Sequence, residues 1–98
     1  MDILKTVQDG IVNIGLKGRL DTNTSPELEN ELKGSLDDAK ELIFDFKELE
    51  YISSAGLRVL LSAQKAMKDK GTMKLLNVSE PIMEIFEITG FVDILTIE

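Results

Sequence analysis

The chain of 98 residues contains no histidine, no cysteine and no tryptophan. Ser-His-Asp and Cys-His catalysis are excluded because each needs a residue that is absent. The same absences exclude zinc sites built from histidine and cysteine, disulfide cross-links and a phosphohistidine carrier. A hydrolase would have to use a carboxylate or a lysine as its base, and no acids pair at a recognisable spacing. We therefore expect that the protein is not an enzyme.

Positive charge and long apolar runs are also scarce. Lysine and arginine number 11 against 18 aspartate and glutamate residues, a net charge of −7. Nucleic acids and anionic membranes both select basic surfaces, so neither is an expected partner. No apolar run approaches the ~20 residues that cross a bilayer, and the first five residues carry both an acid and a base, unlike a signal peptide. These features predict a cytoplasmic protein.

Motifs that hold ions and nucleotides are missing as well. There is no Asp-x-Asp-x-Asp-Gly calcium loop and no glycine-rich phosphate loop of the Walker type. A modest basic patch is more simply a solvated face in a chain of this net charge; it contains Lys65, Lys68, Lys70 and Lys74. We therefore expect no metal and no cofactor.

Hydrophobic periodicity divides the chain into short elements of one domain, residues 1–98. Residues 2–7 read as a strand, Asp9-Gly10 is a hairpin turn signal, and apolar residues then alternate from Val12 to Leu16. Residues 42–46 form a nearly continuous apolar run, which suits a central strand covered on both faces. Further strands are predicted over 72–78 and 92–97.

Three helices are predicted between these strands. The first begins near Thr24-Ser25-Pro26, where either hydroxyl could cap it, and carries an apolar stripe at Leu28, Leu32 and Leu36. The second runs from Ser53 to about Lys70, and the third from Ser79 to Gly90. The order is β-β-α-β-α-β-α-β, which predicts an α/β fold with a mixed sheet because strand-helix-strand units are usually parallel crossovers.

The most informative segment is the predicted strand-to-helix junction over 51–58. It offers two hydroxyls, Ser53 and Ser54, followed by the small residues Ala55 and Gly56. A phosphate at such a junction would find unpaired backbone N–H donors, and small neighbours would let another protein approach closely. A serine at a helix start is nevertheless ordinarily a cap. Asp45 ends the preceding apolar run and could hydrogen-bond to the Ser53–Ser54 backbone, a structural role.

Several spaced blocks resemble the STAS-domain anti-sigma factor antagonist family. The Ile52–Arg58 segment is similar to the family signature, usually written Asp-Ser-(Ser/Thr/Ala)-Gly-Leu. The other similar blocks are Gly18-Arg19-Leu20-Asp21, Ser25-Pro26-Glu27-Leu28, Leu42–Phe46, Leu76-Asn77-Val78, Ile85-Phe86 and Gly90. Together they cover nearly the whole chain, and they imply a STAS-like fold.

The resemblance implies roles for particular residues. Ser54 falls at the position of the family's phosphorylated serine. Ser53 stands where many members have aspartate, which makes it an alternative acceptor. Asp21 corresponds to an acidic residue near the partner-binding surface, although aspartate is also a common turn residue. Ser53, Ala55, Gly56 and Arg58 complete the predicted partner-binding set.

The implied function is that of an anti-sigma factor antagonist. In its unphosphorylated form it would bind an anti-sigma factor serine kinase and release a sigma factor, and phosphorylation of Ser54 would switch it off until a serine phosphatase reversed the change. We expect a monomer, since no long exposed apolar helix demands a dimer. The alternative is an unphosphorylated STAS scaffold or accessory module of a stress-signalling or transporter complex.

Overall fold

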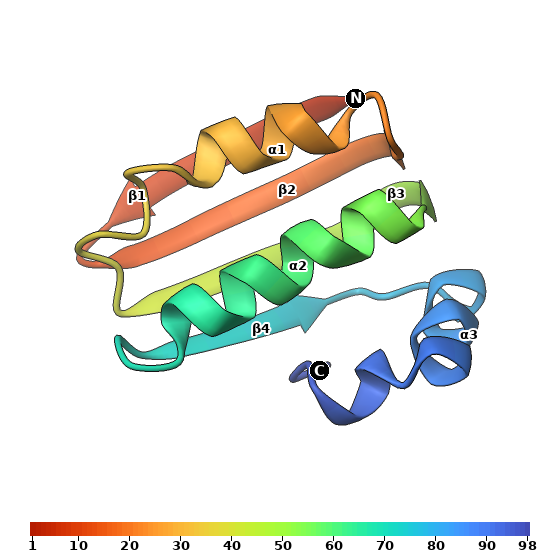
Figure 1. Cartoon of the computed structure of the whole chain (residues 1–98). Helices are drawn as coiled ribbons and strands as arrows, with labels where there is room; N and C mark the ends of the chain where they lie inside the picture. The colour runs from red at the N-terminus through yellow and green to blue at the C-terminus, as the bar shows by residue number, and fades with distance from the viewer.

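The computed structural model describes all residues, 1–98, and has a mixed four-stranded sheet (Figure 1). The strands lie in the order β1 (Asp2–Gln8), β2 (Ile11–Leu20), β3 (Glu41–Ile52) and β4 (Thr72–Leu76). β1 and β2 form the expected antiparallel hairpin, whereas β2 pairs with β3 and β3 with β4 in parallel. The α/β class and the mixed sheet predicted from the sequence are confirmed.

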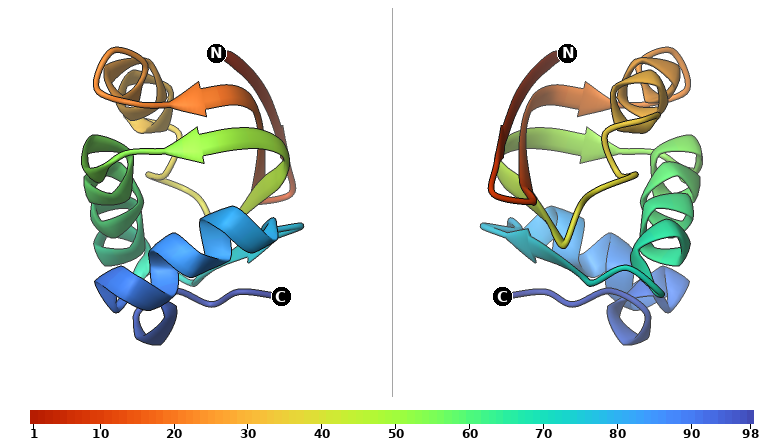
Figure 2. Two further views of the ribbon diagram at one scale, coloured as in Figure 1. Left: turned by 90° about the vertical axis from the view of Figure 1, so that its right-hand side faces the viewer. Right: turned by 90° about the vertical axis from the view of Figure 1, so that its left-hand side faces the viewer.

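Three helices connect and cover the strands: α1 (Ser25–Leu32), α2 (Ser54–Met67) and α3 (Glu80–Thr89). Figure 2 shows α1 and α2 on the same face of the sheet, with α3 packed near β4. No helix reaches the length and apolar character that a membrane crossing requires. The acidic side chains form no group of three or more that could hold a metal ion.

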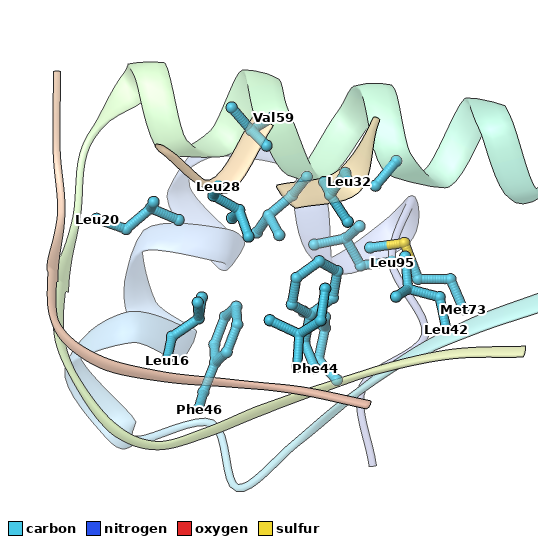
Figure 3. Packing of buried hydrophobic residues seen from close by; sticks show 14 of the residues in the cluster. Leu16, Leu20, Leu28, Leu32, Leu42, Phe44, Phe46, Val59, Met73 and Leu95 are labelled. Carbon is cyan, nitrogen blue, oxygen red and sulfur yellow. The ribbon is translucent and has the colours of Figure 1, made fainter. Parts of the chain in front are cut away.

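One hydrophobic core fills the space between the sheet and the helices (Figure 3). Leu42, Phe44 and Phe46 of β3 are fully buried in it, and Phe46 packs against Phe86 of α3 with ring centroids 6.4 Å apart. The alternate residues Ile43 and Asp45 are only half-buried. The prediction that this strand is covered on both faces is therefore wrong, because the helices cover one face only.

The end of the chain differs from its predicted strand. Gly90 (φ +82°) ends α3, and Phe91–Asp93 then form a 3₁₀ turn in which the Ile94 N–H donates to the Phe91 carbonyl. This segment reaches the sheet through a single parallel bridge, Ile97 to Leu75, whose hydrogen bonds join Leu75 to the Thr96 carbonyl and the Glu98 N–H. The sequence predicted a strand over 92–97, but this segment forms a turn that buries Leu95 and leaves Ile94 and Thr96 exposed.

Two helices are shorter than predicted. α1 ends at Leu32, and Leu36 is buried from the turn that follows rather than from the helix. α2 ends at Met67, and the chain then passes directly against the residue before β3: a Cβ on Gly71 would clash with the Lys40 carbonyl oxygen. Only glycine fits at that crossing.

Candidate functional site

The site lies where β2 and β3 end side by side. Leu20 pairs with Ile52 at the last step of the parallel ladder, and the Ser53 N–H donates to the Leu20 carbonyl at 2.9 Å. The chain leaves both strands at the same edge of the sheet, so α1 and α2 also begin there (Figure 1). This topology brings the loop after Leu20 next to the start of α2.

Asp21 organises that loop. Its Oδ1 accepts the backbone N–H groups of Asn23 and Thr24, both at 3.0 Å. The Thr24 hydroxyl donates to the Arg19 carbonyl at 2.7 Å and also accepts the Asp21 N–H at 2.8 Å. Thr24 occupies the N-cap position of α1 but makes no side-chain cap, so neither hydroxyl predicted to cap this helix does so. These hydroxyls hold the loop instead.

The same hydrogen bonds keep Asp21 ionised. The Thr24 N–H, helped by the Asn23 N–H and the Thr24 hydroxyl, holds the pKa of the Asp21 carboxyl below its usual value of 3.8 against an opposing effect of desolvation. The Arg19 guanidinium adds to this lowering, with Nε 3.9 Å from Asp21 Oδ2. The side chain is still 28% exposed, so its charge is available at the surface.

The Arg19 side chain also stacks on an aromatic ring. Its guanidinium carbon lies 4.3 Å from the centroid of Tyr51, a cation–π contact between neighbouring strands. Neither residue is among the site residues predicted from the sequence. The signal was present, because Arg19 and Tyr51 each stand one residue before the end of their strands and the parallel register sets them opposite each other.

Ser53 and Ser54 play different roles at the start of α2. Ser53 is the N-cap residue: it has extended backbone geometry, and its Oγ accepts the Gly56 N–H at 3.5 Å. Ser54 is the first helical residue and is exposed, and its hydroxyl takes part in none of the hydrogen bonds of the protein. The cap function and the free hydroxyl thus fall on separate serines.

Gly56 lets α2 sit directly on the strand ends. A Cβ at this position would lie 2.8 Å from both Ile52 Cγ1 and Leu20 Cγ, closer than real Cβ contacts. The absent side chain therefore fixes how near the helix comes to the strand ends, and with it the placement of Ser54. Gly56 is buried, so it supports the predicted partner surface from beneath.

A groove runs beside the site between α1 and α2. Arg58 is exposed on its α2 wall and lies within 4 Å of no carboxylate. The groove is lined by Thr22, Ser25, Pro26, Glu29, Ala55, Arg58, Val59 and Ser62. The structure therefore brings the predicted residues of the loop and of α2 to one edge of the molecule.

Asp45 is separate from this edge, contrary to expectation. Its Oδ1 accepts the Asn77 side-chain amide at 3.0 Å and the Lys47 N–H at 2.9 Å, and it makes no bond to the Ser53–Ser54 backbone. These bonds, the Asn77 one above all, hold the pKa of Asp45 below its usual value. β3 continues beyond Asp45 to Ile52, so its carboxylate lies seven residues short of the strand end.

Comparison with known proteins identifies the family of the chain. A model of the STAS domain matches residues 2–98. The chain belongs to the STAS domain family. It is 33% identical over 98 residues to an anti-sigma-B factor antagonist of Bacillus subtilis, an alignment that covers 99% of this chain and 88% of the relative.

Solved structures of anti-sigma factor antagonists share the fold. An anti-sigma factor antagonist from Mycobacterium paratuberculosis superposes with a TM-score of 0.87 at 20% identity, covering 98% of this chain and 83% of that one. Unphosphorylated SpoIIAA, an anti-sigma factor antagonist, gives 0.78 at 19% identity, covering 99% and 87%. The phosphorylated form of SpoIIAA, from Bacillus, gives 0.77 at 20% identity, covering 99% and 91%.

Proposed function

We propose that this STAS protein is an anti-sigma factor antagonist switched by phosphorylation of Ser54. In its unphosphorylated form it binds an anti-sigma factor that is also a serine kinase, and this binding releases a sigma factor in the cytoplasm. The supporting observation is the exposed Ser54 hydroxyl, unbonded at the start of α2 and next to the Asp21 loop. The similarity to antagonists over nearly the whole chain supports the same role.

The binding surface follows from the groups at this edge. Asp21 offers a carboxylate that stays ionised at neutral pH, and Arg19 and Tyr51 add an ordered cation and ring beside it. Tyrosine and arginine are the residue types that most often dominate binding energy at protein interfaces. Ala55 adds little bulk between the two helices, so a partner's catalytic cleft is able to reach the Ser54 oxygen.

Phosphorylation changes this surface without refolding the protein. The Ser54 Oγ–phosphorus bond forms as the bond from the γ-phosphorus of ATP to ADP breaks, and the hydroxyl proton passes to a base on the kinase. The new group carries roughly −1.5 to −2 charge, which the N-terminal end of α2 tolerates. At an interface the same group must lose its water and fit a surface shaped for a hydroxyl. A serine phosphatase restores the hydroxyl by transferring the phosphoryl group to water.

The experiment measures binding to each kinase-type anti-sigma factor encoded in the source genome. Wild-type protein and Ser54→Ala bind one of these with similar affinity, whereas Ser54→Asp binds roughly 100-fold more weakly, a loss of ~3 kcal/mol. Ser79→Asp is the matched control, because Ser79 is exposed at the start of α3 and makes no side-chain cap; it binds as well as wild type. Equal binding by Ser54→Asp, or no binding to any of these factors, contradicts the proposal.

A further inference from the structure

Arg58 lies one helical turn after Ser54. Both residues are on α2, four positions apart, and both are exposed. Residues at this spacing lie on the same helix face with Cβ atoms about 5–6 Å apart. Cα–Cβ bonds in a helix tilt toward its N-terminus, so the Arg58 side chain leaves the backbone in the direction of the turn that contains Ser54.

No carboxylate pairs with Arg58 in the unphosphorylated protein. The five ion pairs of the structure use other cations, and the acid that shares the groove with Arg58, Glu29 of α1, lies beyond 4 Å. Asp21 is already engaged by Arg19 and by the backbone of its own loop. A planar guanidinium with five donors is therefore free one helical turn from the unbonded Ser54 hydroxyl.

From this placement we propose that Arg58 is the internal partner of a phosphate on Ser54, in a pair that forms along α2 when the serine is modified. This inference rests on the proposed function only in taking Ser54 as the modified residue. Arginine pairs with phosphate through two parallel N–H···O bonds. Between Ser54 and Arg58 stand Ala55, Gly56 and Leu57, and none carries a polar side chain that would compete.

The pair adds a second element to the switch. In the unphosphorylated protein Arg58 is available to an acidic group of a partner at the rim of the groove. In the phosphorylated protein the phosphate holds the same side chain, so modification both adds negative charge at Ser54 and withdraws positive charge one turn below. Two contacts to the partner are lost through one covalent change.

The test uses phosphoserine placed at position 54 by genetic encoding, so no kinase is needed. Phosphorus NMR at low ionic strength follows the second ionisation of the phosphate in the full-length protein. Arg58 favours the dianion, so Arg58→Gln raises this pKa by about 0.3 units, on the scale of an i,i+4 ion pair. The charges of Arg19, Asp21 and Glu29 also face this region, and they are unchanged in the variant.

Lys65→Gln is the matched control, because it removes the same charge from the same helix at a position eleven residues after Ser54. It shifts the phosphate pKa by less than about 0.1 unit, since a rise of 1.5 Å per residue puts it ~16 Å away. An unchanged pKa in Arg58→Gln, or an equal shift in Lys65→Gln, overturns the pair. Either result leaves the phosphorylation of Ser54 by a kinase untouched, so the two proposals fail separately.

Discussion

Two serines begin helices at the same edge of the sheet, and they differ in every property that matters for modification. Ser25 is the first residue of α1, is only 4% exposed, and donates its hydroxyl to the Asp21 carbonyl at 2.6 Å. Ser54 is the first residue of α2, is exposed, and donates to no protein group. The same residue type at the same helix position is structural in one case and free in the other.

The difference arises from what precedes each helix. α1 follows a loop whose tight course needs side-chain bonds from Asp21, Thr24 and Ser25 to hold it. α2 follows β3 after a single linking residue, and Ser53 alone provides the cap. A helix that joins its strand directly leaves its first hydroxyl unused, and this is the group we propose is phosphorylated.

Replacing each serine with aspartate should give the largest contrast. Ser25→Asp buries a carboxylate next to Asp21 and removes a hydroxyl donor, so it should lower the free energy of unfolding by about 3 kcal/mol. Ser54→Asp places its charge in water at the positive end of α2 and should raise that free energy by up to ~0.5 kcal/mol. Urea unfolding at neutral pH measures both. Similar losses of unfolding free energy in the two variants would contradict the distinction between a structural Ser25 and a free Ser54.

Gly56→Ala should give the next largest effect. Alanine favours a helix over glycine by about 1 kcal/mol, but its Cβ would press on Leu20 and Ile52, and overpacking costs about 1–3 kcal/mol. We expect a net loss of up to about 2 kcal/mol in urea unfolding. Ser62→Ala, exposed on the same helix, serves as the control and should lose nothing. A Gly56→Ala protein more stable than wild type would show that α2 is not held against the strand ends.

Removing the cap of α2 should have a smaller effect. Ser53→Ala loses the bond from the Gly56 N–H. The loss of an N-cap costs about 0.5–2 kcal/mol, and the long 3.5 Å bond here favours the low end of that range. Ser79→Ala at the start of α3 removes no side-chain cap and should change stability by less than that. Thermal unfolding of the two variants compares them. Equal changes would mean that Ser53 does not act as the cap.

The smallest expected effect is on the pH dependence of stability in the acid range. The pKa of Asp21 is below its usual 3.8 in the folded protein, so its ionised form stabilises the fold above about pH 4, and that contribution is lost as pH falls through the folded-state value. Asp21→Asn keeps an oxygen for the loop but does not titrate, so its melting temperature should fall less steeply between pH 5 and pH 3 than that of wild type. Parallel curves would exclude a role for the Asp21 charge in stability.

The sequence predicted the elements well where periodicity and turn chemistry agreed. The Asp9-Gly10 hairpin, the stripe at Leu28 and Leu32, and the end of α3 at Gly90 are all in place. It failed for residues 92–97, where a short segment rich in apolar residues forms a turn that buries Leu95 alone. It also failed for Asp45, because the sequence did not show that β3 extends seven residues past it.

The candidate site was predictable in position but not in detail. The junction after β3 was identified from its small residues and hydroxyls, and parallel pairing accounts for its proximity to Asp21. Which serine caps and which is free depends on backbone angles at a single residue, the extended Ser53, and on burial. A local sequence pattern predicts neither the backbone angles nor the burial of these serines. Four serines stand at helix starts with no pattern that separates them: Ser25, Ser53, Ser54 and Ser79.

The most direct test maps the phosphorylated residue after incubation with ATP, Mg²⁺ and the anti-sigma factor kinase that binds this protein. Mass spectrometry of the digested product should place one phosphoryl group on Ser54 in the wild type, in Ser25→Ala and in Ser53→Ala, and none in Ser54→Ala. Phosphate on Ser53 or Ser25 in the wild-type protein, or undiminished labelling of Ser54→Ala, would contradict the assignment.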